Sequence, residues 1–414
     1  MSQTFVVDCD CCGGEKDPSV PPFRIFQPKP LKQYGRRAAL RASLLASTGS
    51  LLAACAPTAT TPTAAAAKPT EGPKPSEAPK PTEAAKAGAE APKPTEKPAI
   101  VMTTAPSGKP GLERVQLAFC SQVLCILPYE VARRRGLWEG EGLDVELVYM
   151  RGGAQAMNAL LAESIEWAGT PMDLVVQAWG KGKKPVMLMS TANLPFFALV
   201  AGPKAGVTEI RGLAGKKIGI TNLGTTDHLI AQFLLKQAGV DPNGVEFVAL
   251  GPNLYDLLLR GEVDAGMVQD PAMTLLQRNG GTLLVNLMSR ADSERYLGGP
   301  YQFMGLNTRP EVLEQKTETA RKLVRGLLKA QQWIRSNPGA EIVKAAPSEL
   351  VAGGDLGIFA ESLDKFKNDL YPADGRLEEK SVQQVVQVQR ESGVLKDAPP
   401  FGATDLFTNK LVQP

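Results

Sequence analysis

Residues 56–110 contain 12 prolines and no aromatic residue, and this segment limits the possible folds more than any other feature of the chain. It repeats the pattern Lys-Pro-Thr/Ser-Glu four times, starting at Lys68, Lys74, Lys80 and Lys93. Such a sequence cannot bury enough apolar surface to offset the entropy lost when it is ordered. We therefore expect residues 55–110 to form a disordered stalk, and the folded head to begin at residue 111.

The segment before the stalk is typical of an export signal. A basic stretch, residues 35–41, precedes an apolar run, residues 42–54, that is too short to cross a bilayer as a helix. The run ends in Leu52-Ala53-Ala54-Cys55, which resembles the lipobox of bacterial lipoproteins. We expect residues 1–54 to be a leader and signal peptide. Cys55 would then carry the lipid that anchors the head to the outer face of the cell membrane.

The inventory of reactive side chains argues against an enzyme. The chain has six cysteines and one histidine, His228. Three of the cysteines, Cys9, Cys11 and Cys12, lie in the leader that would be removed. Catalytic metal sites usually need two or three imidazoles, and no G-x-S-x-G motif accompanies His228 as a serine hydrolase would require. We expect no metal, no cofactor and no catalytic residue.

The charges also exclude one class of partner. The chain has 46 Lys and Arg residues against 43 Asp and Glu residues, a formal net charge of +3, and the basic residues are dispersed. Nucleic-acid binding usually requires a concentrated basic surface. We therefore expect no nucleic-acid partner.

The remaining residues, 111–414, alternate short apolar strand candidates with longer helical patterns, which is typical of α/β folds. Strands are expected at 115–119, 143–150, 165–169, 216–221, 245–249, 265–269 and 283–287, with a return strand near 303–307. Helices are expected between them, among them one that begins near Pro128 and ends at Gly136, and others at 154–162, 171–179, 227–239 and 253–260.

Four segments of the head resemble a known family. They are PYEVARRRGLWEGEGLDVELV, GGAQAMNALLAESIEWAG, LAGKKIGITNLGTTDHLIAQFLLKQAGVDP and LLLRGEVDAGMVQDP. In this order they are similar to the sulfonate, nitrate, taurine and thiamine-precursor binding proteins of ABC importers. The resemblance implies the type 2 periplasmic-binding-protein fold, with two α/β lobes joined by a two-strand hinge. Lobe 1 would comprise residues 111–202 and 304–414, and lobe 2 residues 203–303.

The resemblance also implies a function. The head, expected to be monomeric, would capture a small organic anion of the sulfonate, nitrate or carboxylate type between its lobes and deliver it to an ABC permease with its ATPase. A thiamine-pyrimidine precursor is the alternative ligand, and a receptor that signals when occupied would use the same site. A pyrimidine synthase of the same fold is a further alternative, although a cytoplasmic enzyme would have no use for a lipobox.

The strongest ligand-site candidate is the turn Gly224-Thr225-Thr226 with His228, where a glycine turn opens a helix. Amide groups at a helix N-terminus and two hydroxyls suit an anion, although Thr226 or Asp227 could instead cap the helix. His228 could add a charge-assisted contact or simply face water.

Other candidates follow strand ends, where ligands of open α/β sheets bind. In lobe 1 they are Ser121, Gln122 and Thr170, with Asn193 near the crossover to lobe 2. Their side chains could orient a ligand or serve only local capping.

Asp270, before Pro271, occupies a position where the relatives often have glutamate. It would favour a ligand with an N–H or cationic group, or else cap a helix. The thiols of Cys120 and Cys125 could form a disulfide or stay reduced. Tyr129 and Tyr301 are weaker candidates for the site.

Overall fold

The structure is a computed structural model that describes residues 24–25, 100–120, 123–396 and 398–412, all within one compact unit. All of the leader except Arg24 and Ile25, the lipidation site Cys55 and most of the expected stalk lie outside these residues. Their assignments therefore stay predictions.

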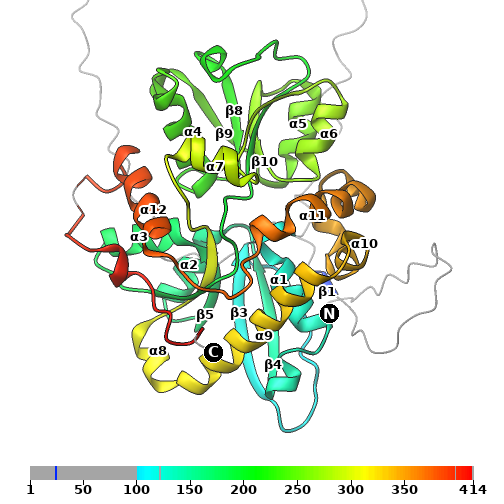
Figure 1. Ribbon diagram of the computed structural model, residues 1–414, viewed down its shortest axis with the longest axis vertical. Helices are drawn as coiled ribbons and strands as arrows, with labels where there is room; N and C mark the ends of the chain where they lie inside the picture. The colour runs from blue at the N-terminus through cyan, green and yellow to red at the C-terminus, as the bar shows by residue number, and fades with distance from the viewer. Residues whose placement is uncertain (1–23, 26–99, 121–122, 397, 413–414) are drawn as a thin grey trace, which may run out of the picture. The chain divides into compact units, whose positions relative to one another are not determined.

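Two mixed sheets form the framework, as the α/β prediction requires (Figure 1). The first has the order β1-β2-β4-β3-β5-β12-β6, made of β1 Arg24–Ile25, β2 Ile100–Thr103, β3 Glu113–Cys120, β4 Leu143–Met150, β5 Trp167–Pro171, β6 Val186–Ser190 and β12 Met304–Thr308. The second has the order β11-β7-β10-β8-β9, made of β7 Ala198–Ala201, β8 Lys217–Ile220, β9 Glu246–Ala249, β10 Ala265–Val268 and β11 Thr282–Asn286. In the first sheet β3 runs parallel to β4 and β5, and in the second β8 runs parallel to β9 and β10.

Helices connect the strands and cover the sheets. They are α1 Val123–Arg134, α2 Gly153–Leu161, α3 Met172–Gly180, α4 Thr226–Gln237, α5 Leu254–Arg260, α6 Ala272–Arg278, α7 Arg290–Leu297, α8 Pro310–Gln315, α9 Thr317–Ser336, α10 Gly339–Ile342, α11 Leu356–Leu370 and α12 Glu379–Glu391. In α9 the buried side chains recur every three or four residues, for example Ala320, Leu323, Leu327 and Ile334, so one face of the helix packs on the core.

The chain crosses between the sheets twice, after β6 and before β12. The crossing segments are hydrogen-bonded to each other, because Leu287 N donates to Phe197 O (3.0 Å) and Thr191 N donates to Met304 O (2.8 Å). Phe303 packs edge to face against Phe197. These paired crossings are the two-strand hinge that the resemblance implied.

One lobe boundary was predicted wrongly. Residues 198–201 were assigned to lobe 1, but they form β7, which pairs with β10 and β11 of the second sheet. A four-residue apolar run carries no sequence sign of the sheet that it joins, because buried strands of either sheet have the same composition. The crossover therefore lies between Ser190 and Ala198.

The end of the stalk was also predicted wrongly. Residues 100–103, which lie within the expected stalk, form β2 and pair antiparallel with β4. This stretch, Ile-Val-Met-Thr, is apolar and rich in β-branched residues, which favours a strand over the proline-rich pattern before it.

Pro128 does not begin α1 but lies inside it, at the sixth residue. A proline inside a helix has no N–H for the carbonyl four residues earlier. Here that carbonyl belongs to Leu124, and the Tyr371 hydroxyl donates to it at 2.9 Å. A residue 247 positions away therefore compensates for the proline, which no local pattern could have shown. The expected end of this helix was right, since Gly136 has a positive φ of 64°.

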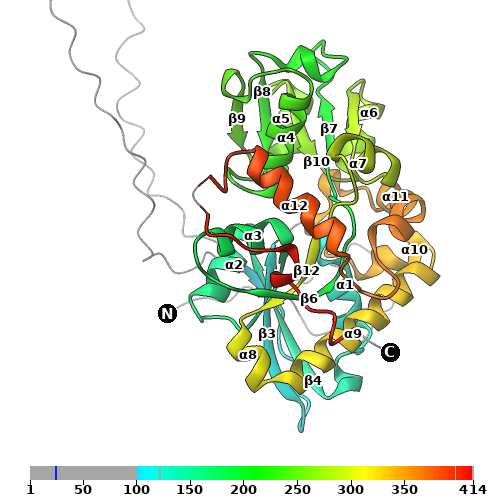
Figure 2. The same cartoon turned by 60° about the vertical axis from the view of Figure 1, so that its left-hand side comes forward.

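The C-terminal helix α12 contacts elements of both lobes (Figure 2). It packs against α3 of the first lobe, where Gln389 Nε2 donates to the backbone oxygen of Asp173 (2.8 Å). It also packs against α4 of the second lobe, where Lys236 Nζ donates to Glu391 O (2.7 Å). Helix α12 thus joins the two lobes on the side of α3 and α4.

Candidate functional site

A cavity lies where the carboxyl ends of strands from both sheets meet. Its lining comes from the first sheet and the segments after it, from the loop after β8, and from the hinge: Cys120, Cys125, Gly152, Gly153, Pro171, Leu174, Phe197, Thr221, Thr225, Thr226, Asp227 and Phe303. This is the position at which open α/β sheets bind ligands. Its volume is about 30 Å3, room for about two water molecules. A larger solute can enter only when the lobes move apart.

Contacts between the lobes surround the cavity. Gln177 Nε2 of α3 donates to Gly224 O at 3.0 Å. The hydroxyl of Ser362 in α11 donates to Asp270 Oδ2 at 2.6 Å. The first hydrogen bond joins α3 to the turn before α4, and the second joins α11 to the segment before α6. The lobes are therefore held together at two places.

The predicted turn at the start of α4 contributes Thr225 and Thr226 to the cavity lining, and its contact with a ligand stays a prediction. Gly224 has a positive φ of 77°, which glycine adopts without strain. The Thr225 hydroxyl lies 2.5 Å from Asn222 O and 2.6 Å from Asp227 Oδ1. Both threonines line the cavity and Thr226 is buried. One N–H group of the first helical turn, that of His228, already donates to the Asp227 carboxyl group. N–H groups at a helix start that have no partner within the helix can serve a bound acceptor.

Asp227, one of two possible helix caps in the sequence, is a charged group in contact with Thr225. Its Oδ2 accepts a hydrogen bond from Thr221 N at 2.5 Å. Burial raises the pKa of Asp227 above its ordinary value, and hydrogen bonds from Thr225 and Thr221 oppose that shift. No lysine or arginine lines the cavity among the described residues.

His228 is not among the residues that line the cavity. Its Nδ1 accepts a hydrogen bond from Gly224 N at 3.0 Å, and its ring packs edge to face on Phe247 of β9. Burial lowers the pKa of His228. The imidazole therefore stabilises the turn that carries Thr225, and a ligand contact by His228 stays a prediction.

Asp173 is a second buried carboxyl group beside the cavity, and no sequence pattern indicated it. It is the second residue of α3, next to the lining residues Pro171 and Leu174. Tyr301 donates its hydroxyl to Asp173 Oδ1 at 2.5 Å. The Thr226 hydroxyl approaches from the other lobe, short of a full hydrogen bond. Burial raises the pKa of Asp173 to about 6, against the opposing effect of Tyr301 and Thr226.

The side chains of three other predicted residues form hydrogen bonds within the protein. The Thr170 hydroxyl accepts a hydrogen bond from Asn307 Nδ2 at 3.0 Å inside the first sheet. Asn193 Oδ1 accepts one from Ser190 at 3.2 Å. Asp270 caps α6 by accepting from Thr274 N at 2.9 Å, in addition to its bond with Ser362. None of the three lines the cavity. Thr170 lies inside β5, and Asn193 and Asp270 follow β6 and β10 but bond to neighbouring groups of the protein.

Ser121 and Gln122 lie outside the described residues, so their part in the site stays a prediction. Their neighbours Cys120 and Cys125 both line the cavity as buried thiols. The disulfide left open by the sequence is not formed in this structure. Tyr129 and Tyr301 are buried next to the site rather than in its lining, since Tyr129 stacks on Phe119 and Tyr301 binds Asp173.

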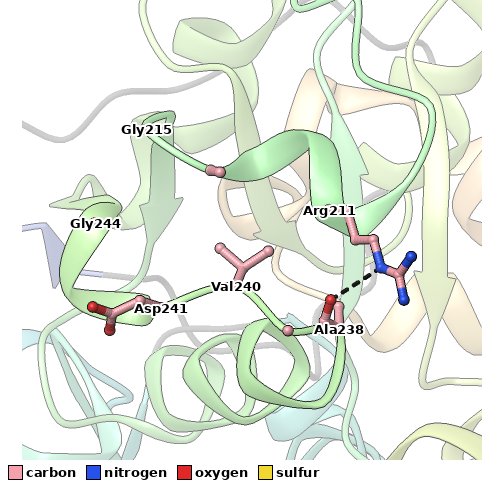
Figure 3. A pocket seen from close by; sticks show the side chains of 8 residues that line it. Arg211, Gly215, Ala238, Val240, Asp241 and Gly244 are labelled. Carbon is pink, nitrogen blue, oxygen red and sulfur yellow. Dashed lines mark hydrogen bonds between the residues drawn. The ribbon is translucent and has the colours of Figure 1, made fainter.

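A larger surface hollow of about 500 Å3 lies in the second lobe, away from the strand ends (Figure 3). It is lined mainly by small residues and backbone, with Arg211 and Asp241 as its charged groups. Both are used locally: Arg211 Nε donates to Ala238 O at 3.2 Å, and Asp241 accepts from Asn243 N at 3.0 Å. We therefore place the candidate site in the smaller cavity between the lobes.

The described part of the chain contains no cluster of three or more His, Cys, Asp or Glu side chains suited to a metal ion. Within the same residues, no helix is both long enough and apolar enough to cross a membrane.

The two sheets, the paired crossings and the cavity between strand ends define a periplasmic-binding-protein fold. A solved structure of the alkanesulfonate-binding protein SsuA from Xanthomonas axonopodis pv. citri, bound to MOPS, has a TM-score of 0.57 and 15% identity. The match covers 73% of this chain and 99% of that one. The profile of the NMT1/THI5-like family matches residues 125–341, more than half of the 414 residues, and the chain belongs to that family.

Other similar proteins agree with this assignment. The ligand-binding component of an ABC-type import system from Staphylococcus aureus, solved with zinc bound, has a TM-score of 0.57 and 15% identity, covering 72% of this chain and 98% of that one. YtlA of Bacillus subtilis, a protein named for a binding role, is 21% identical over 300 residues, which are 70% of this chain and 86% of YtlA.

Proposed function

We propose that this protein is the solute-binding component of an ABC importer, which captures a small solute in the cavity between its lobes and delivers it to a permease. The observation that carries the proposal is the cavity itself. It lies at the strand ends of both sheets, beside a hinge of two paired crossings, and is too small for a solute unless the lobes separate. A hinged pair of lobes that closes on its ligand suits capture and release.

The proposal includes a location. The lipobox at Cys55 and the signal-like run before it support export and lipid anchoring at the outer face of the membrane. The proline-rich segment would then hold a monomeric head within reach of a permease and its ATPase. The similar import component from Staphylococcus aureus supports the same partnership.

We also propose that the head binds its solute without catalysing a reaction. The one histidine is turned into the loop before α4, and its pKa is lowered by burial, so the cavity has no imidazole base. Both carboxyl groups at the cavity are held by hydroxyl or amide donors of the protein. The arrangement suits recognition of a solute.

Two ligand classes fit different features of the site. The first turn of α4 and the hydroxyls of Thr225 and Thr226 suit a small organic anion such as a sulfonate, nitrate or carboxylate. The similarity to an alkanesulfonate-binding protein supports this class. The carboxyl group of Asp227 favours the second class, a thiamine-type pyrimidine, because it can accept hydrogen bonds from ring-bound N–H groups.

A thermal-shift screen of the full chain tests the function. The panel contains sulfonates, nitrate, carboxylic acids and aminopyrimidines. A specific ligand at a hundredfold excess over its Kd stabilises the folded state by about 2.7 kcal/mol. A clear rise of Tm with one class supports capture, and no rise with any compound, after ligand stripping, contradicts it.

The Asp227→Asn variant separates the two ligand classes, because it removes the charge and keeps an acceptor for Thr221 N. An anion should bind this variant as well as the wild type or more tightly, since a like charge is gone. A pyrimidine that donates to the carboxylate should bind more weakly. Asp241→Asn, at an exposed carboxyl group outside the cavity, is the matched control.

A further inference from the structure

The two thiols of the cavity lie on consecutive elements of the first lobe. Cys120 is the last residue of β3, and Cys125 is the third residue of α1. Both are buried, and the two side chains are hydrogen-bonded to each other. The topology therefore brings two sulfur atoms together on the wall of the cavity, five positions apart in the chain.

The second lobe covers this pair in the closed structure. The Gln269 amide, which follows β10, lies 3.8 Å from Cys125 Sγ and donates to it. Burial raises the pKa of Cys125 well above its ordinary value, and the neighbouring Cys120 adds to the shift. Thiol–disulfide exchange requires a thiolate that the oxidant can reach. In the closed structure, burial disfavours the thiolate and keeps an oxidant from reaching it. Separation of the lobes would move Gln269 away from Cys125.

We propose that Cys120 and Cys125 form a redox modification site that is protected while the lobes are closed and is converted to an intramolecular disulfide when they separate. The inference rests on the proposed function for the motion of the lobes and for an oxidising location outside the cytoplasm. It needs no ligand to be known.

The reaction balances with a small disulfide such as oxidised glutathione as the oxidant. One cysteine thiolate attacks the glutathione disulfide, forms a mixed disulfide and releases one glutathione thiol. The second cysteine attacks the mixed disulfide and releases the other glutathione thiol. Two electrons pass from the protein to glutathione, and both cysteine protons end on the released glutathione or in solvent.

The test measures the oxidation rate in the full chain by mass spectrometry. Trypsin cuts after Arg114 and Arg133 and at no position between them, so Cys120 and Cys125 lie in one peptide, apart from the other four cysteines. The disulfide form of this peptide is two hydrogens lighter and resists alkylation. Cys120→Ser should give no such form, and at most a glutathione adduct.

A variant that weakens closure makes the gating measurable. Gln177→Ala removes the interlobe hydrogen bond to Gly224 O. If exchange tracks the open population, the oxidation rate should rise about fivefold, the change that corresponds to one hydrogen bond of about 1 kcal/mol. Gln387→Ala is the matched control, because Gln387 is exposed and bonds only to Glu391 on its own helix. Its rate should equal that of the wild type.

Two results overturn the proposal. If the peptide stays fully reduced in native wild type and Gln177→Ala protein, while urea-unfolded protein is oxidised, the pair is not a modification site. If wild type, Gln177→Ala and Gln387→Ala oxidise at the same rate, closure does not gate it. Failure of the ligand screen with gated oxidation intact would instead count against solute capture alone, so the two failures are distinguishable.

Discussion

The buried carboxyl group of Asp173 gives a prediction whose size follows from the structure. Burial raises the pKa of this group from 3.8 to about 6, and none of the groups that affect this pKa is a cation. The folded state therefore holds the proton more tightly than the unfolded state. Its free energy of unfolding should fall as pH rises from about 4 to 6, by about 3 kcal/mol from this residue, and then stay level.

The Asp173→Asn variant should remove this contribution, because an amide does not ionise and its oxygen can still accept from Tyr301. The assay is urea unfolding of the full chain followed by tryptophan fluorescence, for wild type and variant, from pH 4 to pH 8. The stability difference, variant minus wild type, should grow by about 3 kcal/mol across the range, most of it below pH 7.

An exposed carboxyl group supplies the control for this comparison. Asp374 is exposed and accepts a hydrogen bond from Arg376 N. The Asp374→Asn variant should follow the wild-type curve. A stability difference for Asp173→Asn that is constant with pH, or that shrinks as pH rises, would refute the account of this carboxyl group.

Two further predictions concern packing and the turn before α4. In Gly169→Ala the new methyl carbon would lie 2.6 Å from the Tyr129 hydroxyl oxygen, which should cost about 1–3 kcal/mol of unfolding free energy in urea. Gly140→Ala, with open space at its Cβ, should cost less than 1 kcal/mol, and equal losses in the two would count against this packing. His228 is the one histidine, so its NMR titration is unambiguous, and its pKa should lie below 6.5 because the ring is buried. A pKa at or above 6.5 would show that the ring is exposed in solution.

Much of the fold could be predicted because it depends on local patterns. The strand at 143–150 was placed at the observed bounds, and the glycine turn before α4 was recognised from Gly224 and its threonines. The errors came from long-range partners. Pro128 stays inside α1 because Tyr371 donates to the carbonyl of Leu124, and β7 joins the second sheet through pairing with strands far along the chain.

The site was predicted in part for the same reason. Thr225 and Thr226 reach the cavity because the loop after β8 leads there directly. Asp270 also follows a strand and Thr170 lies near the end of β5, but their polar groups bond to Ser362 and Asn307, each more than 90 positions away. Asp173 was missed because its partner Tyr301 is 128 positions away. The position of a residue after a strand could be predicted from the sequence, whereas the direction of its side chain could not.

The central claim is that one solute binds between the lobes beside Thr225. Calorimetric titration of the full chain with the compound selected by the screen tests it most directly, in wild type, Thr225→Trp and Thr317→Trp. Both threonines are half-buried near a helix start and their hydroxyls donate to a backbone oxygen, but only Thr225 lines the cavity. We expect one-to-one binding by wild type and Thr317→Trp, and none by Thr225→Trp, whose indole would fill the cavity. Unchanged affinity in folded Thr225→Trp would contradict the account, because the solute would then bind elsewhere.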